Sequence, residues 1–217
     1  MDTTAIINGL LSYLCLIIVI TLHEFAHAWT AWKCGDDTAR LQGRVSLNPI
    51  DHMDPIGTVA LPLLAFALAA SNSALASFII GWGRPVPVNP ANLSRRRLHD
   101  SLIAGAGPAM NVVIAMAAVM IARLFDLGGQ VSLGEAAIHL AIISLFLCFF
   151  NLLPIPPLDG SHFLRHAIGM TDERYYAFAR FGFVVVILVI QLPFVRWLLS
   201  AATFGTLDAM AWVVGFK

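Results

Sequence analysis

The chain has 217 residues, of which 59% are hydrophobic and only 12% are charged, and its formal net charge is zero. Soluble domains are usually about 45–50% apolar, so this composition excludes an ordinary soluble protein and leaves no room for a sizeable soluble domain. Nucleic-acid binding depends on an excess of positive charge, so no nucleic-acid partner is expected.

Apolar stretches recur along the chain at lengths that suit a bilayer, whose apolar core takes about 20 helical residues to cross. The candidates cover residues 5–31, 56–80, 101–124, 136–153 and 176–200, and a shorter stretch at 201–216 contains Asp208. The pattern predicts an all-α polytopic membrane protein with about five or six membrane segments. We expect one membrane-embedded domain over residues 1–217, with a core over about 5–162 and C-terminal helices over about 176–217. No basic region precedes the first segment, which favours a retained span over a signal peptide.

Positive charges are concentrated in the polar connectors at 33–55, 81–100 and 154–174, whereas the connector at 126–134 contains none. Cytoplasmic loops carry an excess of Lys and Arg, so the three basic connectors are expected in the cytoplasm and residues 126–134 outside. The segment at 56–80 would then begin and end on the same side, and a polar break at 71–73 interrupts it. We therefore expect a re-entrant hairpin there. Length alone would instead favour a single span.

The first apolar segment runs into the sequence HEFAH at residues 23–27, which fits the pattern H-E-x-x-H. Positions i and i+4 of a helix lie on one face, so His23 and His27 can direct their imidazoles at one metal ion. Glu24 is placed to polarise a metal-bound water. Ionisable groups are costly in apolar surroundings, and coordination of Zn²⁺ would offset that cost. Zinc takes three protein ligands in catalytic sites and keeps one position for water.

The third ligand is sought among aspartates, and Asp51, Asp54 and Asp159 are the candidates. Asp159 is favoured because it follows an apolar segment at its expected cytoplasmic end, the side on which HEFAH also lies. The prolines within 154–157 prevent a regular helix there, and Gly160 permits a sharp bend. The two sites can meet only if residues 56–80 do not cross the membrane once, as the charge distribution independently indicates.

HEFAH is followed by AGPAMN at 106–111 and by NLLPIPPLDG at 151–160, each in an apolar context. In this order the three motifs resemble those of the site-2 protease family of intramembrane zinc metalloproteases. LNPIDHMDPIGT at 47–58 and GWGRPVPVNP at 81–90 are similar to a compact prokaryotic branch of that family. The resemblance covers about residues 16–162, and no PDZ or CBS domain is expected within this length.

The resemblance implies one Zn²⁺ per chain, held by His23, His27 and Asp159, and hydrolysis of peptide bonds in or near the transmembrane segments of other membrane proteins. This activity is called regulated intramembrane proteolysis. Glu24 would take a proton from the attacking water and return it to the leaving amine. A carboxamide would stabilise the oxyanion, with Asn151 the first candidate and Asn111 the second. The expected location is the prokaryotic inner membrane, with the active site toward the cytoplasm. The expected partners are the bilayer and a transmembrane substrate, and the formation of a homo-oligomer is left open.

Several polar residues near these motifs have two interpretations. His52 and Asp54 either support the metal ligands through hydrogen bonds or cap a loop at the water boundary. Asn111 either acts on the oxyanion or ties helices together by hydrogen bonds. His162 lies three positions after Asp159 and is close enough in sequence to approach the site.

The stretch RPVPVNP at 84–90 is extended by its prolines and is expected to form a small strand edge at the cytoplasmic boundary. An unwound substrate would add to this edge as a further strand. Val86 and Val88 are therefore the candidate substrate-binding residues.

Two other functions remain as alternatives. A membrane metal transporter or metal-binding protein would use the same donors, but its polar residues should line a path across the bilayer instead of gathering at one place. An inactive family member acting as a membrane scaffold would not need complete motifs.

Overall fold

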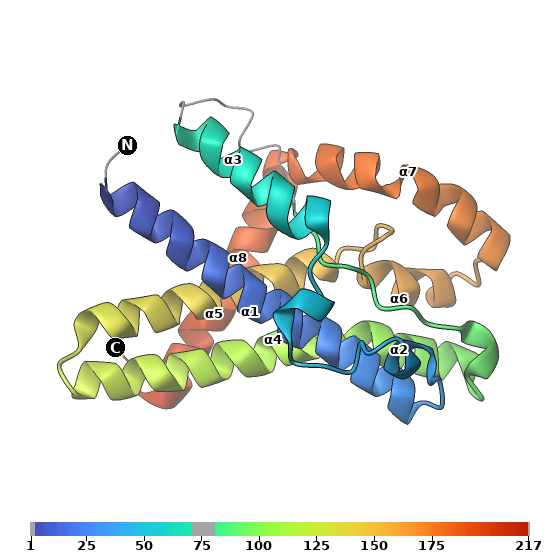
Figure 1. The fold of residues 1–217 in the computed structure, drawn as a ribbon, viewed down its shortest axis with the longest axis horizontal. Helices are drawn as coiled ribbons and strands as arrows, with labels where there is room; N and C mark the ends of the chain where they lie inside the picture. Colours follow the sequence, from blue (N-terminus) through green and yellow to red (C-terminus); the bar gives the residue numbers. More distant parts are fainter. Residues whose placement is uncertain (1–2, 71–80, 217) are drawn as a thin grey trace.

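The computed structural model describes residues 3–70 and 81–216, and every regular element in these ranges is helical (Figure 1). This confirms the predicted all-α fold. The helices are α1 (Thr3–Lys33), α2 (Thr38–Leu41), α3 (Leu61–Ala70), α4 (Arg96–Leu127), α5 (Val131–Asn151), α6 (Gly160–Ala167), α7 (Asp172–Ile190) and α8 (Pro193–Val214). Single helical turns occupy Pro49–Asp51, Pro55–Ala60 and Pro90–Asn92.

Among the described residues, four helices are long and apolar enough to cross a membrane: α1 from Ile6, α4, α5 and α8. The long helices α4 and α5 run antiparallel, joined by a tight turn in which Gly129 has a φ of +71°. In Figure 1, α1 passes across this pair, and α8 packs against it from another side. Large apolar side chains such as Leu10 and Leu14 on α1 and Val113 on α4 are exposed. Such a surface suits contact with lipid.

Small residues allow the backbones of the bundle to approach closely. A core cluster joins Ala115, Ala118 and Val119 of α4 to Ala141 and Leu145 of α5. Interfaces between membrane helices are enriched in such small residues because there is little hydrophobic driving force between helices in lipid. The same close packing brings α1 against α4 at the level of HEFAH.

The predicted C-terminal segmentation is wrong in one respect. The apolar stretch at 176–200 is not one helix: α7 ends at Ile190, and α8 begins at Pro193 and runs to Val214. Proline has no backbone N–H and its ring clashes with a preceding helical turn, so it is favoured at the first position of a new helix. The long spanning candidate is therefore α8, which includes all but the last two residues of the stretch at 201–216 that was expected to be a separate short segment.

Trp82 lies side by side with residues 57–58, which begin the segment predicted at 56–80. The Trp82 N–H donates to the Gly57 carbonyl at 3.2 Å, and the Thr58 hydroxyl donates to the Trp82 carbonyl at 2.7 Å. The helical turn Pro55–Ala60 runs directly into α3, and together they form a helical stretch that is about 24 Å long, shorter than the apolar core of a bilayer at about 30 Å. The contact of Trp82 with residues 57–58 agrees with the predicted hairpin, whose course over residues 71–80, including the polar break at 71–73, falls outside the described residues.

The strand edge predicted at residues 84–90 is wrong, because the structure has no β-strand there. Residues 81–89 form no helix, and no strand occurs in the described parts of the chain. Two buried side chains hold this segment in place. The Arg44 guanidinium donates to the carbonyls of Arg84 and Pro85, and the Asp36 carboxylate accepts the Asn89 N–H at 2.7 Å. These interactions use backbone groups that a strand would pair with a neighbouring strand.

Candidate metal centre

The two histidines lie one turn apart on the face of α1 that packs against α4. Their exposed fractions are only 4% for His23 and 6% for His27. Gly107 of α4 makes this close packing of the two imidazoles possible, because a Cβ at this position would overlap His27 Nε2 and would lie 2.6 Å from His23 Nε2. The glycine of AGPAMN thus leaves space for both imidazoles.

Asp159 reaches the same place from a turn that follows α5 and directly precedes α6. Prolines within residues 154–157 keep the chain out of a helix. Gly160 allows the turn to fold tightly onto the end of α5, since a Cβ there would overlap the Leu152 carbonyl oxygen. Gly182 of α7 lies against the Pro156 carbonyl in the same way and covers the turn from the other side. The carboxylate is therefore carried on a stiff, closely packed bend.

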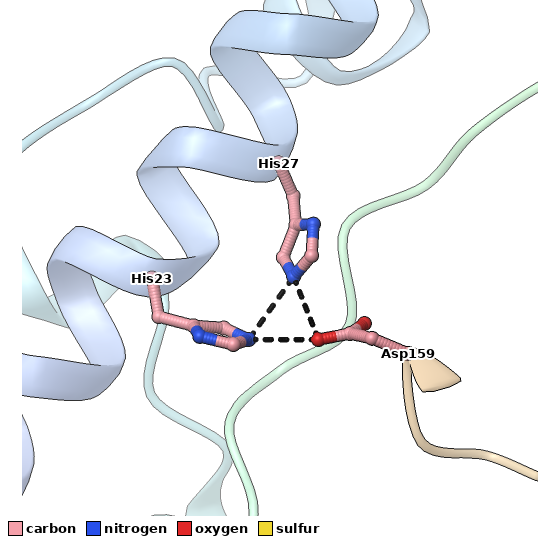
Figure 2. Close-up of side chains that lie close together, drawn as sticks. All are labelled: His23, His27 and Asp159. Carbon is pink, nitrogen blue, oxygen red and sulfur yellow. Dashed lines mark hydrogen bonds and ion pairs between the residues drawn. The ribbon is translucent and has the colours of Figure 1, made fainter. Parts of the chain in front are cut away.

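Three donor atoms converge between α1 and this turn, as Figure 2 shows. His23 Nε2 and His27 Nε2 are 3.0 Å apart, and each lies 3.3 Å from Asp159 Oδ2. Within the described residues these three form the one group of His, Cys, Asp or Glu side chains arranged to hold a metal ion. The structure thus brings together the three ligands expected from the sequence.

The spacing of these atoms fits a small tetrahedral cation. Ligands at about 2.0–2.1 Å from a tetrahedral Zn²⁺ are separated from one another by about 3.3 Å. The tautomer of His27 is also suitable. Its Nδ1 lies 2.6 Å from the Ile103 carbonyl oxygen, which can only accept a hydrogen bond. Nδ1 therefore carries the proton and Nε2 offers a lone pair, the arrangement that metal-binding histidines use.

Positive charge beside Asp159 acts on its carboxyl group. Burial alone would raise the pKa of the Asp159 carboxyl, whereas positive charge on His27 and His23 lowers it well below its usual range. A cation bound at the same place would supply that positive charge to the carboxylate.

A cavity of about 520 Å³ opens beside the three metal-ligating side chains and also exposes Glu24, the predicted proton acceptor. The segment at 81–83 passes closely over this residue, since a Cβ at Gly83 would lie 3.2 Å from Glu24 Oε1. Trp82 and Phe183 of α7 meet edge to face across the cavity wall, with ring centroids 5.1 Å apart. Val86 and Val88 line the same cavity.

The two asparagines proposed for the oxyanion lie in different surroundings. Asn151 lines the cavity at the end of α5, and its Nδ2 donates to the Leu147 carbonyl at 3.0 Å. Asn111 is fully buried in α4 and is not among the residues lining that cavity. Its backbone carbonyl accepts a hydrogen bond from the Ser144 hydroxyl of α5, while its side-chain amide has no hydrogen-bond partner in the protein. Of the two, only Asn151 is placed at the cavity.

The loop residues expected as possible supports lie elsewhere in the structure. His52 is fully buried, and its Nε2 donates to the Ser46 carbonyl at 2.7 Å. Asp54 caps the turn at Pro55–Ala60 by accepting the N–H groups of Ile56 and Gly57. Neither residue, nor Asp51, joins the donor group. The interpretation of His52 and Asp54 as loop-stabilising residues therefore agrees with the geometry.

Sequence patterns did not identify several residues that shape the site. Asp100 of α4 lies in the cavity wall and accepts hydrogen bonds from His162 and His166 of α6. Gly107 was part of a recognised motif, but its contact with both imidazoles depends on how α1 packs on α4. A glycine inside an apolar helix was the available signal, because such a residue usually marks close packing. Arg44 lies in the basic connector at 33–55, and its sequence context does not predict that it binds the carbonyls of Arg84 and Pro85.

Comparison with known proteins identifies the family. A model of "Peptidase family M50" matches residues 11–134 and 129–191. The chain is 34% identical over 203 residues to "Putative zinc metalloprotease YwhC" of Bacillus subtilis, covering 87% of this chain and 86% of that protein. It is 31% identical over 195 residues to "Putative zinc metalloprotease Rip2" of Mycolicibacterium smegmatis, covering 88% of this chain and 69% of that protein. No solved structure matches the chain. The chain belongs to peptidase family M50, the site-2 protease family.

Proposed function

We propose that this protein is an intramembrane zinc metalloprotease that hydrolyses peptide bonds in or near transmembrane segments of other membrane proteins. The observation that carries the proposal is the convergence of His23, His27 and Asp159 at tetrahedral spacing beside a cavity that exposes Glu24. The family membership and the names of the relatives support zinc as the metal and proteolysis as the reaction.

Zinc held by the three donors would act as a Lewis acid and lower the pKa of a water molecule to about 7. Glu24 accepts the proton of the attacking water and donates it to the leaving amine. Ile103 keeps His27 in the ligating tautomer through its carbonyl. Asn151 is the carboxamide placed to donate to the oxyanion from the cavity wall, once its Nδ2 turns away from the Leu147 carbonyl.

The cavity suits an extended peptide better than an intact helix. It is bordered by residues 81–88, whose backbone runs beside Glu24 without belonging to a helix or strand. An unwound segment of substrate would lie along Val86 and Val88 and pair with their backbone groups. The apolar side chains of the wall would receive the apolar side chains of a transmembrane segment.

We place the active site toward the cytoplasmic side of a prokaryotic inner membrane. The support is the distribution of Lys and Arg, which occur in the connectors at 33–55, 81–100 and 154–174 and are absent from 126–134. The metal-ligating residues lie near these basic connectors, in the C-terminal part of α1 and just after α5.

Replacement of the proposed proton acceptor tests the reaction. Purified protein in detergent is incubated with a panel of single-span substrates, and wild type is compared with Glu24→Gln. We expect the variant to keep its zinc but to lose cleavage by about 100-fold or more, because an amide cannot accept the proton. Glu135→Gln, on α5 and outside the cavity, is the control and should cleave normally. A Glu24→Gln variant that cleaves at the wild-type rate would show that the protein is not this type of hydrolase.

The strand-addition model is tested by removing backbone donors along the cavity edge. Replacement of Val86 and Val88 with proline should abolish cleavage and leave the zinc content intact, because proline has no N–H to pair with substrate. Replacement of both by threonine keeps the side-chain shape and the N–H groups and should preserve cleavage. Normal cleavage by the proline variant refutes this mode of binding.

A further inference from the structure

A hydrogen-bonded cluster outside the donor group connects α4 to α6. Asp100 of α4 accepts two hydrogen bonds on the same oxygen, Oδ2. One comes from His162 Nδ1 at 2.9 Å and the other from His166 Nε2 at 2.6 Å. Both histidines are on α6, four positions apart, so their rings lie on one face of that helix. One carboxylate thus holds two successive turns of a helix.

The helix that is held in this way carries the third metal ligand. Asp159 immediately precedes α6, and its carbonyl accepts the His162 N–H at 3.1 Å in the first helical turn. A displacement of α6 therefore displaces Asp159. The other two ligands belong to α1 and are placed by a different part of the chain.

The turn of α4 that contains Asp100 also holds α1. Ile103, three positions further, accepts the hydrogen bond from His27, and Gly107 one turn later touches both imidazoles. Residues 100–107 of α4 therefore set the position of the two histidine ligands directly. Through Asp100 they also set the position of α6 and of the aspartate that precedes it.

We propose that Asp100 is a positioning residue, which fixes Asp159 at ligating distance from the two imidazoles by clamping α6 onto α4. Asp100 itself is not a ligand: among the described residues, it does not belong to the group arranged to hold a metal. His162 and His166 satisfy its carboxylate as N–H donors. The inference rests on the metal site of the proposed function. It goes beyond that function by assigning the residue that keeps Asp159 in position relative to the two histidine ligands.

The test is a double-mutant cycle read out by zinc affinity, measured by competition with a chromophoric chelator on the full chain in detergent. Asp100→Ala should weaken zinc binding by about tenfold or more, as loss of a residue that orients a ligand usually does. In a background of Asp159→Ala, the same substitution should change affinity by less than about twofold, because the ligand through which Asp100 acts is already gone. Cobalt-loaded Asp100→Ala should also lose the intense visible absorption of a tetrahedral site.

Other variants separate positioning from general loss of folding. Asp100→Asn keeps an oxygen that can accept both N–H groups and should recover most of the affinity. His166→Ala removes one of the two hydrogen bonds and should give an intermediate loss, so the test remains decisive if Asp100→Ala does not fold. Asp126→Ala, at the far end of α4, breaks only an exposed pair with Arg123 and should bind zinc normally.

Two results would overturn the inference: unchanged affinity in Asp100→Ala, or an equal loss with and without Asp159. Neither depends on cleavage. A wild-type chain that binds no zinc would instead overturn the proposed function.

Discussion

Gly107 of α4 lies directly against the two histidine ligands of α1. Any side chain there would occupy the space of the His27 and His23 rings. Within the same helix, Gly105 has more room, since a Cβ there would meet only Phe163 Cζ at 3.4 Å. Two glycines two positions apart therefore have different tolerance for a methyl group, which makes them a matched pair.

We expect Gly107→Ala to lower zinc affinity by about tenfold or more, a loss comparable to that caused by disturbing the orientation of a ligand. Alanine is otherwise favoured over glycine in a helix by about 1 kcal/mol, so Gly105→Ala should bind zinc normally and melt at the same or a higher temperature. Chelator competition and thermal unfolding in detergent measure the two quantities. Wild-type zinc affinity in Gly107→Ala would contradict the close packing described here.

At the scale of single residues, the sequence predicts those site residues whose role follows from nearby positions in the chain. His23, Glu24 and His27 follow from helical spacing, and Asp159 follows from the predicted topology combined with a family resemblance. Asp100 could not be predicted, because its partners His162 and His166 are more than 60 positions away and no spacing rule connects them. Contacts that depend on how two helices pack have no signature in either helix alone.

At the scale of elements, the segment at 56–80 decides whether the two parts of the site can meet. The hydrogen bonds between Trp82 and residues 57–58 show that the chain just after this segment lies beside the start of the segment. The charge distribution predicted this return of the chain. The boundary between α7 and α8 was missed because the apolar run at 176–200 hides the break, although Pro193 was a usable signal for a new helix.

The membrane orientation of these elements is tested by single cysteines in a background without the three native cysteines. Ile50→Cys and Arg84→Cys flank the segment at 56–80, and Ile168→Cys follows α6. We expect these three to react with a membrane-impermeant thiol reagent only after cells are permeabilised. Gln130→Cys, in the connector without positive charge, should react in intact cells. If Arg84→Cys instead behaves like Gln130→Cys, the segment crosses the membrane and the predicted topology is wrong.

At the scale of the whole molecule, the site is built from parts that are far apart in the chain. The ligands on α1 and the ligand before α6 are separated by about 130 residues, and α4 lies between them as the common support. Large apolar side chains face outward along α1, α4 and α8, whereas the ionisable donors are enclosed. This arrangement agrees with a reaction that takes place below the lipid surface in a cavity shielded from it.

The proposed site requires zinc to be bound jointly by α1 and the turn at Asp159. X-ray absorption at the zinc edge of the purified protein tests this directly, with Asp159→Ala measured beside the wild type. We predict a four-coordinate site with only nitrogen and oxygen ligands at about 2.0–2.2 Å, and loss of one oxygen ligand or of the metal in the variant. A sulfur ligand at about 2.3 Å, or a spectrum that does not change in Asp159→Ala, would contradict the account.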